Sequence, residues 1–138
     1  MEEKEKKAQE MYMEFQMLEQ HIKKLQAQLE AVTGQLMELN STSNGLDEFE
    51  KIKGEREIFV PVSSGIFAKA KLTETTELLV NVGSNVVVKR DVSSAKKLIH
   101  GQMNEIKKIQ ERIADQLDKL TSRAGELQEG LQELVSRE

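Results

Sequence analysis

The sequence contains no cysteine and no tryptophan, and it has one proline, four phenylalanines and one tyrosine. The absence of cysteine excludes disulfides, thiolate metal sites and thiol nucleophiles together. Aromatic residues make up 4% of the chain and charged residues 32%, which is too polar for a thick globular core and is typical of long amphipathic helices. With 138 residues, the chain has room for one compact domain or one elongated unit.

Long hydrophobic runs are missing as well. The apolar stretches are short pieces such as residues 86–88, far below the length that crosses a membrane. Residues 1–10 are charged throughout, unlike a signal peptide, so we expect a cytoplasmic protein without a membrane partner. The formal net charge of -4 argues against nucleic acid as a partner, because nucleic-acid-binding proteins usually carry a basic surface.

Apolar residues recur at alternating spacings of three and four over residues 8–39, which is the heptad pattern of a coiled-coil helix. The pattern returns over residues 99–134, after Asp91 or Ser93, either of which can cap a second helix. If the two segments pair antiparallel, each a residue of one meets a d residue of the other without a slip. Gln110 is the polar entry at an a position, where it either fixes the register or is simply tolerated.

Between the two heptad segments, turn-forming residues at 40–45 predict that the first helix ends near Asn40. A helical turn or two could follow before Gly54. Strand-like residues then predict two β-hairpins, with turns at 63–65 and 83–85. The predicted single unit, 1–138, is divided into a coiled-coil helix (1–40), a linker (41–56), two hairpins for assembly (57–91) and a second coiled-coil helix (92–138).

The predicted fold class is therefore α+β: a long antiparallel two-helix coiled coil with two β-hairpins between the helices, which join an oligomeric β-barrel platform. Isolated hairpins are marginal in water, and pairing their edges with neighbouring chains would bury their apolar faces. The residues expected to mediate assembly are Ile58, Val60, Val62, Phe67, Leu78, Val80, Val82, Val86 and Val88.

No enzyme, metal or cofactor site is predicted. His21 and His100 have no metal-ligand spacing with another His or Cys, and no nucleophile, base and orienting group can be assembled from motifs. Residues 82–85 lack the glycines and lysine of a phosphate loop.

The central block resembles the alpha-class subunits of archaeal prefoldin. The resemblance is carried by Phe59-Val60-Pro61-Val62, the Gly65 turn, Phe67-Ala68-Lys69-Ala70, Val80-Asn81-Val82-Gly83 and Val86-Val87-Val88. In that family, alpha subunits have two hairpins and beta subunits one. The resemblance implies an ATP-independent chaperone, a hexamer of two alpha and four beta subunits, unfolded clients bound at coiled-coil tips, and their delivery to a group II chaperonin.

Residues near the two chain ends suggest how such a tip would bind. Flexible, polarizable methionines repack against varied partners, and residues Gly125 and Gly130 weaken the second helix locally, so that the tip could fray open. The residues predicted to bind clients are Met11, Tyr12, Met13, Phe15, Met17, Leu127, Leu131, Leu134 and Val135.

Two other functions stay open at this point. One is a structural coiled-coil adaptor whose arms dock a defined folded partner through a fixed groove. The other is a nucleic-acid-associated protein, which the paired lysines at 23–24, 96–97 and 107–108 allow and the acidic balance disfavours.

Overall fold

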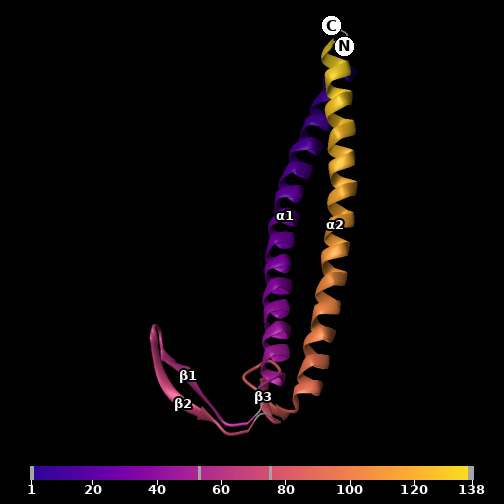
Figure 1. The fold of residues 1–138 in the computed structure, drawn as a ribbon. Coiled ribbons are helices and arrows are strands. Elements are labelled where there is room, and N and C mark those ends of the chain that lie inside the picture. The colour runs from indigo at the N-terminus through magenta and orange to yellow at the C-terminus, as the bar shows by residue number, and fades with distance from the viewer. Residues whose placement is uncertain (1, 53, 75, 137–138) are drawn as a thin grey trace. The chain divides into compact units, whose positions relative to one another are not determined.

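The structure is a computed structural model that describes residues 2–52, 54–74 and 76–136. Its elements are two long helices with four strands between them, in the order shown in Figure 1: α1 (Glu2–Glu50), β1 (Arg56–Ser63), β2 (Ile66–Leu72), β3 (Leu78–Asn81), β4 (Val87–Arg90) and α2 (Val92–Ser136). They form two compact units, which we call unit 1 (1–36 with 105–138) and unit 2 (37–104). The predicted fold class, two helices with two hairpins between them, is confirmed.

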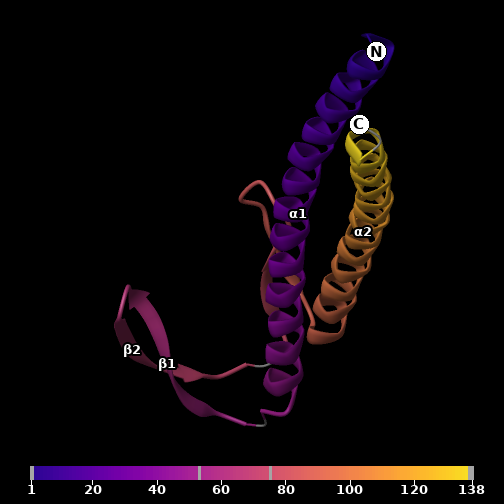
Figure 2. The same cartoon turned by 90° about the horizontal axis from the view of Figure 1, so that it is seen from above.

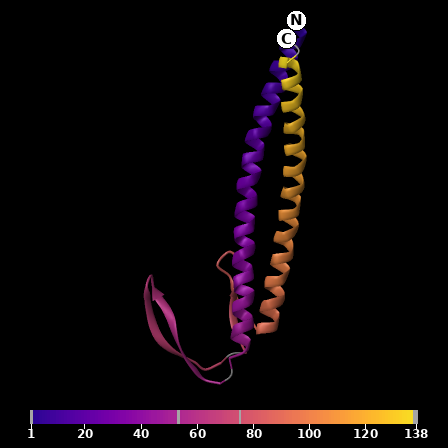
Figure 3. The same ribbon diagram turned by 45° about the horizontal axis from the view of Figure 1, so that its top comes forward.

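Unit 1 is an antiparallel pair of helical segments. The start of α1 and the end of α2 lie at the same end of this pair (Figures 1 and 3). Leu25, Ile113 and Leu127 are buried, and the other a and d residues of the unit are half-buried. The heptad pattern thus identifies the side chains that face the partner helix, because a and d positions share one helix face.

Contacts between the helices agree with the antiparallel pairing that the sequence predicts. The Nε2 of Gln110 donates a hydrogen bond to Oγ1 of Thr33 at 3.1 Å, beside the expected layer of Val32 and Gln110. Gly130 lies so close to Met11 that a Cβ built on the glycine would be 2.5 Å from Cε of the methionine. The half-buried amide of Gln110 therefore has a partner, which reduces the cost of a polar group in the seam.

The first helix does not end near Asn40: α1 continues to Glu50, so this prediction is wrong and the connection to β1 is 51–55 rather than 41–56. Ser43 falls on the next a position and is buried, with its hydroxyl hydrogen-bonded to Nε2 of His100 at 3.2 Å. Oγ1 of Thr42 donates to the carbonyl oxygen of Glu38 at 3.0 Å, one helical turn back. Both hydroxyls have hydrogen-bond partners while the helix continues, so neither of them requires the helix to end here.

Backbone hydrogen bonds between residues three apart end α1, and an aspartate caps the start of α2. The N–H groups of Lys51 and Ile52 donate to carbonyl oxygens three residues back, at 3.1 Å each. At the other helix, Oδ1 of Asp91 accepts a hydrogen bond from the N–H of Ser94 at 2.7 Å, which identifies Asp91 as the N-cap. Hydrogen bonding by Ser94, through its side chain first and its backbone N–H second, lowers the pKa of the Asp91 carboxyl, because it favours the charged form.

The first hairpin is a two-stranded twisted ribbon of β1 and β2 (Figure 2). Its register runs from Arg56 opposite Leu72 to Ser63 opposite Ile66, with an irregularity between Pro61 and Ser63. Gly65 has a φ of 77°, which a residue without a Cβ adopts at little cost. The predicted hairpin and its turn are confirmed.

The second hairpin pairs β3 with β4, from Leu78 opposite Arg90 to Asn81 opposite Val87. Its turn contains Gly83, Ser84 and Asn85, with φ values of 110°, 50° and 60°. Oδ1 of Asn81 accepts a hydrogen bond from the N–H of Gly83 at 2.9 Å, which supports this left-handed stretch. The second predicted hairpin is therefore also confirmed.

Replacing Gly45 by alanine tests the helix across the predicted break. A Cβ at this position meets nothing within 4 Å, and alanine is favoured over glycine in a helix interior by about 1 kcal/mol. We expect Gly45→Ala to raise the midpoint of thermal unfolding by roughly 3–5 °C, followed by circular dichroism at fixed protein concentration. Gly65→Ala is the control: it should lower the midpoint because of its positive φ. A midpoint that falls in Gly45→Ala would contradict the continuous helix.

Candidate functional site

The residues predicted to bind clients lie in unit 1, near the start of α1 and the end of α2. We call residues 2–17 and 124–136 the terminal segment. Five of the predicted residues face the other helix: Leu127 is buried, and the remaining four are half-buried, namely Met11, Phe15, Leu131 and Leu134. The other four are exposed: Tyr12, Met13, Met17 and Val135. The structure thus divides one predicted group into seam residues and surface residues.

Met13 and Met17 lie on the outside of α1. They are one helical turn apart and occupy positions f and c of the heptad, on the face that points away from the seam. Their exposed fractions are 64% and 70%. Tyr12 is 55% exposed, and its hydroxyl accepts a hydrogen bond from Nε2 of Gln16 at 3.2 Å. These side chains are accessible while the coiled coil remains closed.

Open grooves run between the two helices, one that extends beyond the terminal segment along the helix pair and one within it. One, of about 440 Å³, lies beside Phe15, where Ala124 and Gly125 leave space on α2. The second, of about 230 Å³, is lined by Met11, Gly130 and neighbouring residues. The small residues of α2 create these spaces, since a larger side chain at the same position would fill them.

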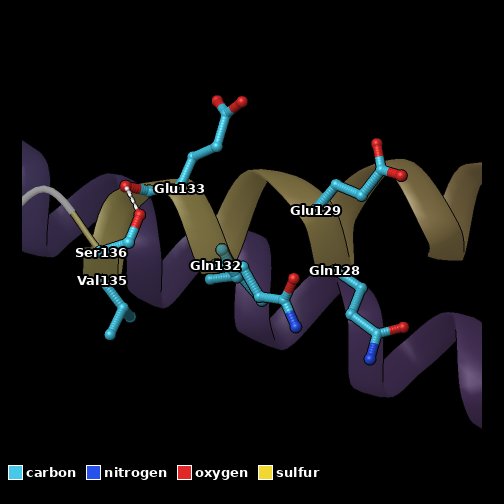
Figure 4. A pocket seen from close by; sticks show the side chains of 7 residues that line it. Gln128, Glu129, Gln132, Glu133, Val135 and Ser136 are labelled. Carbon is cyan, nitrogen blue, oxygen red and sulfur yellow. Dashed lines mark hydrogen bonds between the residues drawn. The ribbon is translucent and has the colours of Figure 1, made fainter.

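A third groove, of about 820 Å³, follows the end of α2. In Figure 4, Gln128, Gln132 and Val135 extend on one side of the helix, while Glu129 and Glu133 extend on the other. The lining therefore combines amide groups, which can donate and accept hydrogen bonds, with the carboxylates of the two glutamates and the exposed isopropyl group of Val135.

An ion pair joins the two helices in this region. The guanidinium of Arg123 contacts Glu14 at 3.1 Å and Glu126 at 3.3 Å. The hydrogen bond to Glu14 is the main cause of the raised pKa of Arg123. All three side chains are about half exposed or more, so the pair helps to orient the helices and adds little to stability.

Exposed apolar side chains also gather on the hairpins of unit 2. Among the residues predicted to mediate assembly, five are half-buried (Ile58, Val60, Leu78, Val80 and Val88) and four are exposed (Val62, Phe67, Val82 and Val86). Four further exposed side chains were not predicted: Phe59, Ile66, Leu79 and Val87.

The register of the first hairpin shows which of its faces carry apolar side chains. Val60 lies opposite Ala68 on one face of the first hairpin, whereas Pro61 lies opposite Phe67 on the other face. Both faces of this ribbon are therefore apolar. The signal was present in the sequence, because consecutive residues of a strand point to opposite faces and residues 58–62 are all apolar.

Glutamates accompany the lysines of the hairpins. Lys69 contacts Glu57 at 3.0 Å, Lys71 contacts Glu55 at 2.8 Å, and Lys89 contacts Glu77 at 3.9 Å. These pairs offset the local positive charge, which weakens the nucleic-acid alternative. Over residues 2–52, 54–74 and 76–136, no group of three or more His, Cys, Asp or Glu side chains could hold a metal ion. In the same part of the chain, no helix is long and apolar enough to span a bilayer.

Comparison with known proteins identifies the family of this chain. The sequence profile described as "Prefoldin subunit" matches residues 18–137. The chain belongs to the prefoldin family. Prefoldins are chaperones, and their alpha subunits form oligomeric complexes with other prefoldin subunits. The resemblance found in the sequence is therefore confirmed.

Relatives and a solved structure agree with this membership. A prefoldin subunit alpha of Archaeoglobus fulgidus is 30% identical over 134 residues, covering 97% of this chain and 96% of the relative. One from Methanobrevibacter smithii is also 30% identical, over 112 residues, covering 81% and 76%. The fold is similar to that in a cryo-EM structure of filamentous PFD from Methanocaldococcus jannaschii. The TM-score is 0.75 at 16% identity, and the match covers 84% of this prefoldin chain and 96% of the other.

An ion cluster in unit 2 predicts a pH dependence of stability. Nζ of Lys96 contacts Oδ1 of Asp47 at 2.7 Å and also Oε2 of Glu50. The hydrogen bond between Lys96 and Asp47 is the largest cause of both pKa shifts: it lowers the pKa of Asp47 below 3.8 and raises that of Lys96 above 10.5. The stabilisation is thus lost as pH falls through the lowered pKa of Asp47 or rises through the raised pKa of Lys96.

Replacing Lys96 by methionine removes this charge and keeps an apolar stem of similar length. We expect Lys96→Met to lower the unfolding midpoint by a constant amount between about pH 5 and pH 9, and the difference from wild type to shrink as the pH falls below 3.8 and through the lowered pKa of Asp47. Lys107→Met, at an exposed position of α2, is the matched control and should change the midpoint little. A difference that is the same at all pH values would contradict the assigned ion cluster.

Proposed function

We propose that this chain is a subunit of an ATP-independent holdase, which binds non-native polypeptides at the terminal segment. The observation that carries the proposal is the exposure of Met13 and Met17 on the outer face of α1, in a protein whose family is a chaperone family. Apolar side chains on that face contribute nothing to the seam, so their burial against a client is available as binding free energy.

The kind of side chain suits a binder without a fixed target sequence. Methionine is unbranched and polarizable, so it repacks against client side chains of different shape. Tyr12 adds an amphipathic ring beside the two methionines, and Val135 adds a further exposed apolar group at the end of α2. The seam residues of the same predicted group, such as Leu127, then serve mainly to hold the two helices together.

Fraying of the coiled coil is not required for this contact. Tyr12, Met13, Met17 and Val135 are exposed with the helices paired, and the groove beside Phe15 is open in the same state. Binding without unwinding avoids the cost of breaking helical hydrogen bonds and seam contacts. Several subunits acting on one client would raise the apparent affinity through a high effective concentration.

The exposed hairpin surfaces support a role in assembly. Two-stranded sheets leave strand edges and apolar faces open, and closing them with neighbouring chains satisfies both. We infer that the partners are prefoldin beta subunits, in a cytoplasmic hexamer of two alpha and four beta chains with a β-barrel platform. Transfer of clients to a group II chaperonin, without nucleotide hydrolysis by this chain, completes the proposed function.

Serine substitutions test the client-binding face. We expect the double substitution Met13→Ser and Met17→Ser, in the complex reconstituted with beta subunits, to raise the concentration needed for half-maximal suppression of aggregation by at least about tenfold. A tenfold change corresponds to about 1.4 kcal/mol, which is less than the roughly 1.5–3 kcal/mol that burial of a single apolar side chain contributes. The measurement is light scattering after dilution of chemically denatured citrate synthase without ATP.

Met37→Ser is the matched control, because Met37 is also exposed on α1 and lies outside the terminal segment. It should leave suppression unchanged. Equal suppression by the double variant and the control, with intact assembly by native mass spectrometry, would exclude the outer face of α1 as the binding surface. No suppression by the wild-type complex would favour the adaptor function instead.

A charge placed on a hairpin tests assembly. Val80 is half-buried opposite Val88, so Val80→Lys places a cation on a face that the proposed platform covers. We expect native mass spectrometry to detect subunits in place of the complex, while circular dichroism still reports helix. Lys89→Gln, on the neighbouring strand, should assemble normally. A stable complex containing Val80→Lys would contradict the proposed platform.

A further inference from the structure

The methionines of this chain differ sharply in exposure. Met1 lies outside the described residues. Met11 and Met103 are half-buried at seam positions, whereas Met13, Met17 and Met37 are 64%, 70% and 69% exposed. Two of the three exposed thioethers are thus adjacent on the outer face of α1, inside the terminal segment. The chain has no cysteine and no tryptophan, so methionines are its readily oxidised side chains.

We propose that Met13 and Met17 form a methionine sulfoxide modification site, whose oxidation by a peroxide switches off client binding and whose reduction restores it. The functional part of this inference rests on the proposed function. The site itself depends only on the exposure of the two thioethers. Neither a metal nor a cofactor is involved.

The oxidation step is a two-electron oxygen transfer. The thioether sulfur attacks one oxygen of hydrogen peroxide, an S–O bond forms as the O–O bond breaks, and the released oxygen leaves as water. The sulfur is oxidised and the peroxide is reduced. In the reverse direction, a thiol-dependent sulfoxide reductase removes this oxygen as water while two thiols become a disulfide.

Oxidation changes the property on which the binding face depends. A thioether is apolar and flexible, whereas a sulfoxide is polar and a strong hydrogen-bond acceptor. Burying it against a client then removes a hydrated polar group from water, which opposes binding. Because positions 13 and 17 point away from the seam, their sulfoxides remain in solvent in the unbound protein. The coiled coil itself is therefore preserved, and the effect is reversible.

Peptide mapping of the reconstituted complex tests the modification site. During treatment with hydrogen peroxide, mass spectrometry should detect sulfoxides at Met13, Met17 and Met37 well before those at Met11 and Met103. Suppression of citrate synthase aggregation should fall together with the conversion of Met13 and Met17. Circular dichroism should stay unchanged over the same interval. Oxidation of Met11 as fast as Met13 would overturn the site.

Leucine variants distinguish the effect of oxidising Met13 and Met17 from the effect of oxidising other residues. The Met13→Leu, Met17→Leu double variant keeps apolar side chains of similar volume, and after peroxide treatment it should retain the suppression measured before treatment. Met37→Leu should lose suppression as the wild type does. Incubation of the oxidised wild-type complex with methionine sulfoxide reductases A and B and a thiol should restore suppression. Equal loss in the double variant and the wild type would refute the switch.

The two proposals fail in different ways. If the untreated complex does not suppress aggregation, the holdase function is wrong and the switch falls with it. The oxidation map still decides whether Met13 and Met17 are oxidised before Met11 and Met103. If the untreated complex is active and stays active with both residues fully oxidised, the holdase function stands and the switch is refuted.

Discussion

Heptad packing between α1 and α2 buries Leu25, Ile113 and Leu127, and the described part of unit 1 contains no other element against which these side chains could pack. Helices in proteins gain most of their stability from packing an apolar face against another element, so both helices depend on the seam. The seam also separates the apolar residues that are buried from those that stay accessible. Apolar residues off the seam have no place to be buried within the pair, which leaves Met13 and Met17 accessible.

The hairpins, unlike the helices, leave their large apolar side chains exposed. Each is a two-stranded sheet, and large side chains such as Phe59, Phe67 and Leu79 remain exposed. A ribbon of this kind cannot cover its own two faces, because burying the face of a sheet requires another sheet or a helix packed against it. The two halves of the proposed function thus have separate physical origins: incomplete sheets for assembly, and surplus apolar residues outside a complete seam for client binding.

Local sequence preference and packing disagree at residues 40–45. Asn, Ser, Thr and Gly favour a turn in isolation, and the sequence predicted a break there. In the fold, Ser43 occupies a seam position and bonds to His100, so burial and a long-range hydrogen bond outweigh the weak local preference. That interaction joins residues far apart in the chain, and a reading of adjacent residues could not detect it.

The sequence by itself determined the two helices, the two hairpins, their turns and the antiparallel register, because each depends on a period or a turn residue that neighbouring positions carry. It also contained the residues of both candidate surfaces, though Phe59, Ile66, Leu79 and Val87 were overlooked. Only the tertiary structure decided that α1 continues to Glu50 and that Ser43 is buried with its hydroxyl bonded to His100. Burial depends on which distant residues meet, and that is a property of the folded chain.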